Sequence, residues 1–153
     1  MTVARLLVHV EGQTEETFVK EILAPHLMSQ GFESVGARIV GNARLRGRRG
    51  GIRAWPAVKK DILNHLREDP GCAATTMVDY YGLPQTGERG WPGRDAAQHL
   101  KTVDKAAQVQ IALAAEVTAE MVTVSIRHVS CLSWLCTSLK GFCLVNARSS
   151  LMQ

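Results

Sequence analysis

The chain has 153 residues, enough for one ordinary domain and too few for two of usual size. With 46% hydrophobic and 21% charged residues, the composition indicates a soluble globular protein. The formal net charge of +4 indicates a polyanionic partner only if the basic residues are clustered. The four cysteines show no CxxC pair and no zinc-type spacing, so we expect neither a disulfide framework nor a thiolate metal site. The sequence shows no signal peptide and no apolar segment long enough to span a membrane, so we expect a cytoplasmic protein.

The first predicted element is a buried strand over residues 3–10, which are rich in Val and Leu and contain no turn residue. Glu11 follows it directly, and Gly12 permits a sharp turn. Thr14 is a good N-cap for a helix whose first turn contains Glu15, where a negative charge suits the helix dipole. In a doubly wound sheet this order places Glu11 at the carboxyl end of a strand, where such folds bind ligands.

The remaining elements follow from hydrophobic periodicity and from turn residues. They are a helix over residues 14–30 with Phe18, Ile22, Leu23 and Leu27 on its buried face and a bend or end at Pro25, a strand over 34–40, a helix that begins at Trp55-Pro56 and buries Val58, Ile62, Leu63 and Leu66, a strand over 72–78, and a helix from Asp95 to about Glu120. Strands that alternate with helices in this way predict the α/β class, with a parallel sheet covered by helices.

Two of the three predicted strands end in an acidic residue, Glu11 and Asp79. In a parallel sheet both residues would lie at the same edge, with Glu15 four residues beyond Glu11 on the following helix. Mg²⁺ takes oxygen ligands, usually one or two carboxylates with water and substrate phosphate, so the three residues are candidate metal ligands. The alternative is structural: Glu15 complements the helix dipole and Asp79 caps a turn.

A basic segment lies between the second strand and the following helix. No carboxylate occurs from residue 34 to residue 60, and the loop within this stretch is rich in Gly and Arg. Arginine pairs bidentately with phosphate, so we favour contact with a nucleic-acid backbone over a merely solvated loop. The candidate contact residues are Arg44, Arg46, Arg48, Arg49 and Arg53.

Two further features have competing interpretations. Tyr80 and Tyr81 could stack on a base, but we favour a turn in which both tyrosines cover the end of the sheet. His9 lies inside a buried strand and is expected to be a core histidine with its hydrogen bonds satisfied, not a catalytic base.

The segment from Val10 to Glu15, Val-Glu-Gly-Gln-Thr-Glu, resembles the first motif of TOPRIM domains, the fold shared by topoisomerases, primases and OLD-type nucleases. Residues 6–27, 48–55 and 75–84 look more closely like a bacterial family of unknown function that is grouped with TOPRIM-like proteins. The resemblance extends over about residues 3–120 and implies a TOPRIM-like sheet flanked by helices.

The resemblance also implies a metal-dependent nuclease that uses Mg²⁺ or Mn²⁺ to hydrolyse phosphodiester bonds. Glu11 corresponds to the TOPRIM glutamate, Glu15 to the extra carboxylate of OLD-type nucleases, and Asp79 to the first residue of the Asp-x-Asp motif; all three would be catalytic metal ligands. The chain departs from the pattern at Tyr81, which occupies the second aspartate position. One ligand is therefore missing or supplied elsewhere, which puts two-metal chemistry in doubt.

The segment 121–153 differs from the rest, because all 14 acidic residues lie at or before Glu120. Members of the similar family continue with a strand and a His-Glu-Phe-Glu motif that this chain lacks. A shifted reading frame would allow the codons of residues 127–143 to encode that motif. We therefore expect a domain over 1–120 with an incomplete C-terminal part and an atypical tail, a hypothesis that the nucleotide sequence tests. Read in the given frame, Val122, Val124 and Ile126 alternate as a strand would.

Two other functions stay open. The chain could be a non-catalytic nucleic-acid-binding or regulatory subunit that partners an ATPase, as in the phage-defence complexes that the resemblance to OLD-type systems suggests. It could also be an inactive truncated product. The partners expected are the backbone of DNA or RNA, an ATPase protein or a second copy of the chain, and not a membrane.

Overall fold

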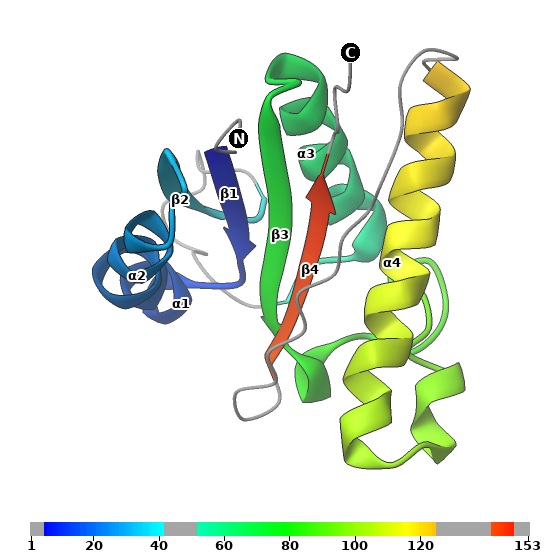
Figure 1. The fold of residues 1–153 in the computed structure, drawn as a ribbon. Coiled ribbons are helices and arrows are strands. Elements are labelled where there is room, and N and C mark those ends of the chain that lie inside the picture. The colour runs from blue at the N-terminus through cyan, green and yellow to red at the C-terminus, as the bar shows by residue number, and fades with distance from the viewer. Residues whose placement is uncertain (1–4, 42–51, 125–141, 149–153) are drawn as a thin grey trace.

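A computed structural model describes residues 5–41, 52–124 and 142–148 (Figure 1). Four strands form one sheet in the order β2-β1-β3-β4, namely β1 (Arg5–Val10), β2 (Ser34–Ile39), β3 (Cys72–Asp79) and β4 (Phe142–Arg148). The first three are parallel, which confirms the predicted α/β class, and β4 pairs with β3 in the antiparallel direction. The alternation at Val122 and Val124 does not produce a strand, because both residues lie in the last helix; Ile126 lies outside the described residues.

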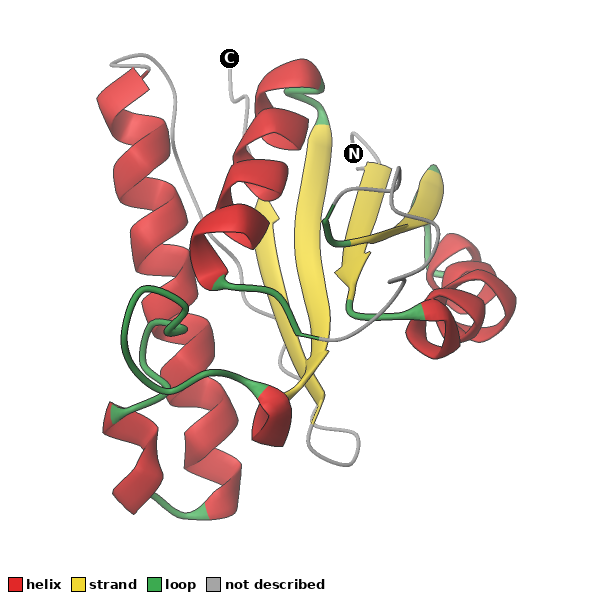
Figure 2. Cartoon of the chain, turned by 180° about the vertical axis from the view of Figure 1, so that it is seen from behind, coloured by secondary structure: helices red, strands yellow, loops and turns green. Residues whose placement is uncertain are grey.

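Helices cover both faces of the sheet. One face carries α1 (Gln13–Phe18), a π-helical turn η1 (Val19–Leu23) and α2 (Ala24–Ser29). The other face carries α3 (Trp55–Glu68), which lies in front of the sheet when the molecule is seen from behind (Figure 2). The long helix α4 (Thr102–Val124) runs beside α3 and β4. Two short 3₁₀ helices, η2 (Tyr80–Gly82) and η3 (Ala96–His99), lie between β3 and α4. None of the described helices is long and apolar enough to cross a bilayer.

The first helical segment differs from the prediction in its cap and in its buried face. Gly12, not Thr14, is the N-cap of α1, and no side chain caps the helix. Pro25 neither ends nor breaks the helical segment that runs from residue 13 to residue 29. Its missing N–H falls next to the π-helical turn, in which the Ala24 N–H bonds to the carbonyl of Val19, five residues back. The wider turn shifts the buried face, so Val19 is fully buried and Ile22 is 59% exposed.

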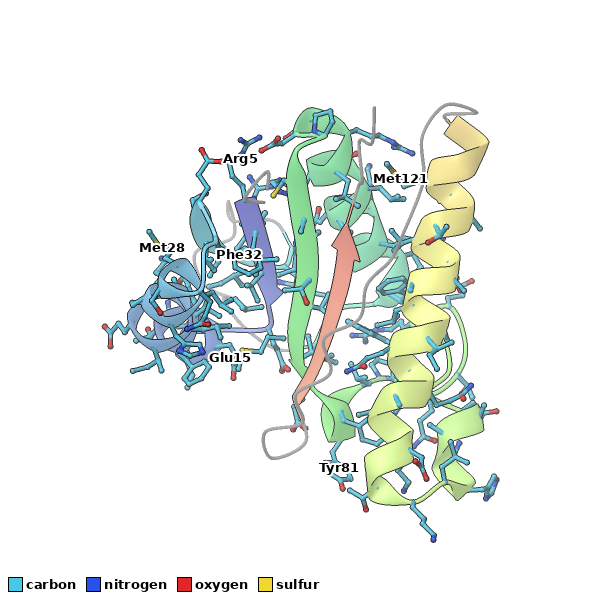
Figure 3. All side chains as sticks on the ribbon, viewed as in Figure 1. Arg5, Glu15, Met28, Phe32, Tyr81 and Met121 are labelled. Atoms are coloured by element: carbon cyan, nitrogen blue, oxygen red, sulfur yellow. The ribbon has the colours of Figure 1, made fainter. Side chains whose placement is uncertain are left out.

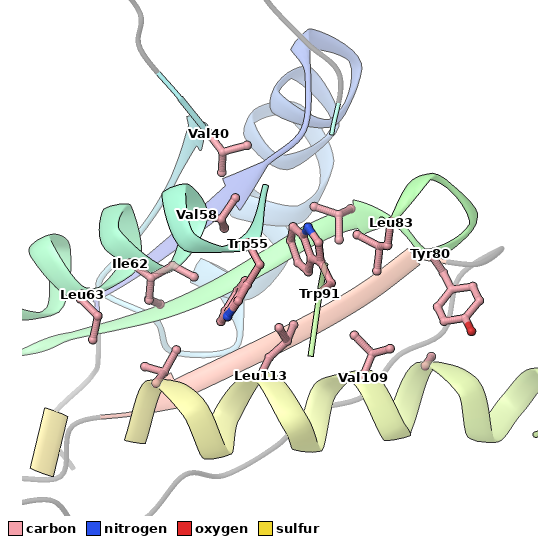
Figure 4. Packing of buried hydrophobic residues seen from close by; sticks show 14 of the residues in the cluster. Val40, Trp55, Val58, Ile62, Leu63, Tyr80, Leu83, Trp91, Val109 and Leu113 are labelled. Atoms are coloured by element: carbon pink, nitrogen blue, oxygen red, sulfur yellow. The ribbon is translucent and has the colours of Figure 1, made fainter. Parts of the chain in front are cut away.

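The strands divide the interior into two cores, because successive side chains point to opposite faces of the sheet. On the α1–α2 side, Leu6, Val8 and Val10 of β1 pack with Val19 and with the partly buried Phe18, Leu23 and Leu27. On the other side, β3 packs against α3 and α4 in a larger cluster (Figure 4). All four apolar residues predicted for the buried face of α3 belong to this cluster: Val58, Ile62, Leu63 and Leu66.

The last helix begins at Thr102 and not at Asp95 as predicted. Residues 96–99 form the 3₁₀ helix η3, and Leu100 is extended, so the α-helical bonding starts with the carbonyl of Lys101. The preceding loop folds back onto α4 at Gly93, whose φ is +75°. A Cβ atom at Gly93 would lie 2.8 Å from the backbone oxygen of Gln108 and 2.8 Å from the Cβ of Ala112.

This close approach predicts a large difference between two glycines with the same backbone conformation. Gly87 has a φ of +76°, but a Cβ there would meet nothing within 4 Å. We expect Gly87→Ala to lower the free energy of unfolding by about 1 kcal/mol, through backbone strain alone. Gly93→Ala should cost roughly 1–3 kcal/mol more, because the loop must move off α4. Urea unfolding measures both variants, and equal losses would contradict the contact at Gly93.

Candidate functional site

The carboxyl ends of β1 and β3 bring Glu11 and Asp79 together. The parallel register pairs Val10 with Met77, so Glu11 lies beside the last residues of β3. The backbone N–H of Asp79 donates to Oε2 of Glu11 over 3.5 Å. Glu15 lies in the first turn of α1 (Figure 3), close enough for its charge to act on Glu11. We call Glu11, Glu15 and Asp79 the acidic edge.

The electrostatics of Glu11 indicate that the other two carboxylates act on it. The pKa of Glu11 is raised chiefly by partial burial, and the negative charges of Glu15 and Asp79 raise it further. The hydrogen bond from the Asp79 N–H acts in the opposite direction, because it stabilises the charged form. No salt bridge between described residues involves Glu11, Glu15 or Asp79. The acidic edge is therefore a partly desolvated concentration of negative charge that a cation would relieve.

The described residues contain no group of three or more His, Cys, Asp or Glu side chains that could hold a metal ion. A closed metal centre with all its ligands from the protein is thus not formed by this part of the chain. The donor set at the acidic edge consists of carboxylate oxygens, and Mg²⁺ is commonly held by one or two carboxylates with water and substrate phosphates. The residues present fit this open kind of site.

Asp79 also has the structural role that was left open from the sequence. It is the N-cap of η2, and its Oδ1 accepts the backbone N–H of Tyr81 over 3.0 Å. The two tyrosines that follow have opposite environments. Tyr80 is buried, as predicted, whereas Tyr81 is 65% exposed, so the prediction that both cover the sheet is wrong for Tyr81.

Of the predicted phosphate-contacting arginines, Arg44, Arg46, Arg48 and Arg49 lie outside the described residues. Arg53 is described, and its backbone carbonyl accepts the indole N–H of Trp91 over 2.9 Å. Its side chain lies against Gly41, where an added Cβ would come within 2.8 Å of Nε. Gly41 follows the carboxyl end of β2, and the Val40 N–H bonds to the carbonyl of Val10, the residue before Glu11. The structure therefore places this guanidinium at the same edge of the sheet as Glu11.

His9 departs from the expectation of a satisfied core histidine. It is completely buried, as predicted, but neither ring nitrogen has a hydrogen-bond partner among the described residues. Its ring packs edge-on to His65 of α3, with 6.0 Å between centroids. Burial, with smaller contributions from His65 and Arg38, lowers the pKa of His9 to about 4. Strand alternation is the sequence signal that places His9 on the face opposite Val8, toward α3.

A family model described as a domain of unknown function (DUF4276) matches residues 10–147. The matched range contains all three residues of the acidic edge and most of β4. No curated protein and no solved structure matches the chain.

Proposed function

The chain belongs to the DUF4276 family, and from the geometry of its acidic edge we propose that it is a nuclease of TOPRIM type that hydrolyses phosphodiester bonds with Mg²⁺ or Mn²⁺. The observation that carries the proposal is the convergence of Glu11 and Asp79 at the carboxyl ends of neighbouring parallel strands, with the pKa of Glu11 raised by burial and by the charges of Glu15 on α1 and of Asp79. This edge is where open α/β sheets bind their ligands.

The acidic and basic residues at this edge would bind different groups, a cation and a phosphate respectively. Glu11 and Asp79, at adjacent strand ends, would hold the cation, with Glu15 close enough to add negative potential. When bound, the cation supplies Lewis-acid polarisation of the phosphate and lowers the pKa of an attacking water. Arg53 lies at the same edge and would pair with a backbone phosphate of the nucleic acid. Because the pKa of Glu11 is raised, cation binding will release protons over a higher pH range than for an ordinary glutamate.

The test is Glu11→Gln, which keeps the shape of the side chain and an oxygen that can accept the Asp79 N–H. We expect cleavage of supercoiled and single-stranded DNA and of RNA in Mg²⁺ or Mn²⁺ to fall by at least about a hundredfold, since metal stabilisation of the transition state amounts to several kcal/mol. Thermal unfolding gives a second measurement. Mg²⁺ should raise the melting temperature of the wild type and have a much smaller effect on Glu11→Gln.

Glu16→Gln is the matched control. Glu16 lies in the first turn of α1 beside Glu15, but its carboxylate pairs with Lys20 over 2.7 Å. It should retain both cleavage and the Mg²⁺-dependent rise in melting temperature. Equal losses in Glu11→Gln and Glu16→Gln would show a general effect of negative charge and would contradict a site built on Glu11.

Two observations favour a second function, a non-catalytic nucleic-acid-binding or regulatory subunit. No three-ligand metal group exists among the described residues, and the position two residues after Asp79 is occupied by a tyrosine. A folded wild-type protein that binds nucleic acid with strong salt dependence, but cleaves none in Mg²⁺ or Mn²⁺, would establish this function over the nuclease.

A further inference from the structure

Tyr81 is a large aromatic side chain that the fold leaves exposed next to the acidic edge. It is 65% exposed, whereas Tyr80, Trp55 and Trp91 are each less than 5% exposed. The other large exposed hydrophobic side chains are aliphatic or thioether groups: Ile22, Met28, Leu100 and Ile111. Tyr81 is therefore the only Phe, Tyr or Trp side chain that is largely exposed among the side chains whose exposure the structure describes.

The position of this ring is fixed from two sides. Its backbone N–H bonds to Oδ1 of Asp79 over 3.0 Å, which ties it to the acidic edge. Its ring packs edge-on to the ring of Tyr80, with 5.4 Å between centroids and 87° between planes. Tyr80 is itself held by Arg94, whose guanidinium lies 4.2 Å from the ring centroid and donates to the phenol oxygen over 3.0 Å. The exposed ring is thus supported by a buried tyrosine that is itself bonded to Arg94.

We propose that Tyr81 is a base-stacking residue for single-stranded nucleic acid bound at the acidic edge. The inference rests on the proposed function, because it takes the phosphate of the bound nucleotide to lie near Asp79. A base attached to that phosphate can stack on a flat, partly apolar surface, and a tyrosine ring at the same edge supplies one. Such stacking does not depend on which base is bound. Only an unpaired base has a free face, because the bases of a duplex already stack on their neighbours. The substrate class is therefore single-stranded or locally unpaired nucleic acid.

The experiment measures fluorescence anisotropy of two labelled oligonucleotides of equal length, one of deoxythymidine and one of abasic residues. Ca²⁺ replaces Mg²⁺, so that an oxygen-ligand cation is present while cleavage is suppressed. Stacking of a base on an aromatic side chain is worth enough that Tyr81→Ala should weaken binding of the deoxythymidine strand about fivefold or more. Tyr81→Phe should bind like the wild type, because the ring face is retained. Neither variant should alter binding of the abasic strand.

Ile111→Ala controls for loss of an exposed apolar side chain elsewhere, since Ile111 is 60% exposed on α4. It should leave both affinities unchanged. If the wild type and Tyr81→Ala bind the deoxythymidine strand equally, or if the variant weakens the abasic strand as much, stacking is overturned while the proposed function stands. If folded wild-type protein binds neither strand, nor RNA or duplex DNA, the proposed function itself fails.

Discussion

Acidification from pH 7 to pH 4 should destabilise the protein by about 3 kcal/mol through His9 alone. In the unfolded chain the imidazole binds a proton near pH 6.5, whereas burial in the folded state lowers its pKa to about 4. Between these values the unfolded state binds more protons, so this contribution is fully present above pH 6.5 and is lost as the pH falls toward 4. The size follows from about 1.4 kcal/mol for each unit of pKa difference.

The measurement is urea unfolding of the wild type and of His9→Leu across this pH range. Leucine fills a similar volume and removes two buried nitrogens that have no partner among the described residues. We therefore expect His9→Leu to be at least as stable as the wild type at pH 7 and to lose much less stability on acidification. The lowered pKa of His65 acts in the same direction in both proteins, so the difference between them isolates His9. Parallel pH profiles would refute the assignment.

Trp55→Ala should lower the free energy of unfolding by about 3–5 kcal/mol, the range for removing a large buried aromatic side chain. Trp55 is 3% exposed and lies at the start of α3, in the cluster that joins α3, β3 and α4 (Figure 4). Its ring packs against Trp91 with 5.2 Å between centroids, and its indole N–H donates to Glu116 of α4 over 2.7 Å. The substitution therefore removes packing and a helix–helix hydrogen bond together.

Trp55→Phe separates the two contributions. Phenylalanine retains an aromatic ring in the cluster but cannot donate to Glu116, and we expect a loss of about 1–2 kcal/mol in urea unfolding. Lys59 also pairs with Glu116, over 3.5 Å, so the carboxylate keeps one partner in the variant. Similar losses for Trp55→Ala and Trp55→Phe would mean that the ring contributes little, contrary to its burial.

The elements that the sequence predicted correctly are those with strong local signals. β1 and β3 are short apolar runs, and α3 begins with a proline and repeats apolar residues at helical spacing. The elements that it missed depend on distant partners. β4 pairs with a strand some seventy positions earlier, about which the local pattern carries no information. The start of α4 is set by the fold-back of the loop at Gly93 onto the helix, which is again a tertiary contact.

The candidate site shows the same division. Convergence of Glu11 and Asp79 follows from parallel strands alone, and the hydrogen bond between them agrees with it. The opposite environments of Tyr80 and Tyr81 were not predictable, because both are tyrosines in the turn that follows β3, only one residue apart. Burial of Tyr80 depends on its contact with Arg94, fourteen residues away. The surroundings of the His9 nitrogens, which have no hydrogen-bond partner among the described residues, likewise depend on what α3 places against the strand.

The π-helical turn at Val19–Leu23 fixes the angle between two parts of the first helical segment. Each residue of an α-helix advances the side-chain direction by about 100° around the axis. A turn that contains one extra residue therefore rotates the side chains that precede it relative to those that follow it. Leu23 and Leu27 pack toward the sheet after the turn, while Glu15 interacts with Glu11 before it. Deleting one residue within the turn would restore regular helix and swing Glu15 by that angle. A chain of that length would have to give up either the apolar contact of Leu23 and Leu27 or the position of Glu15.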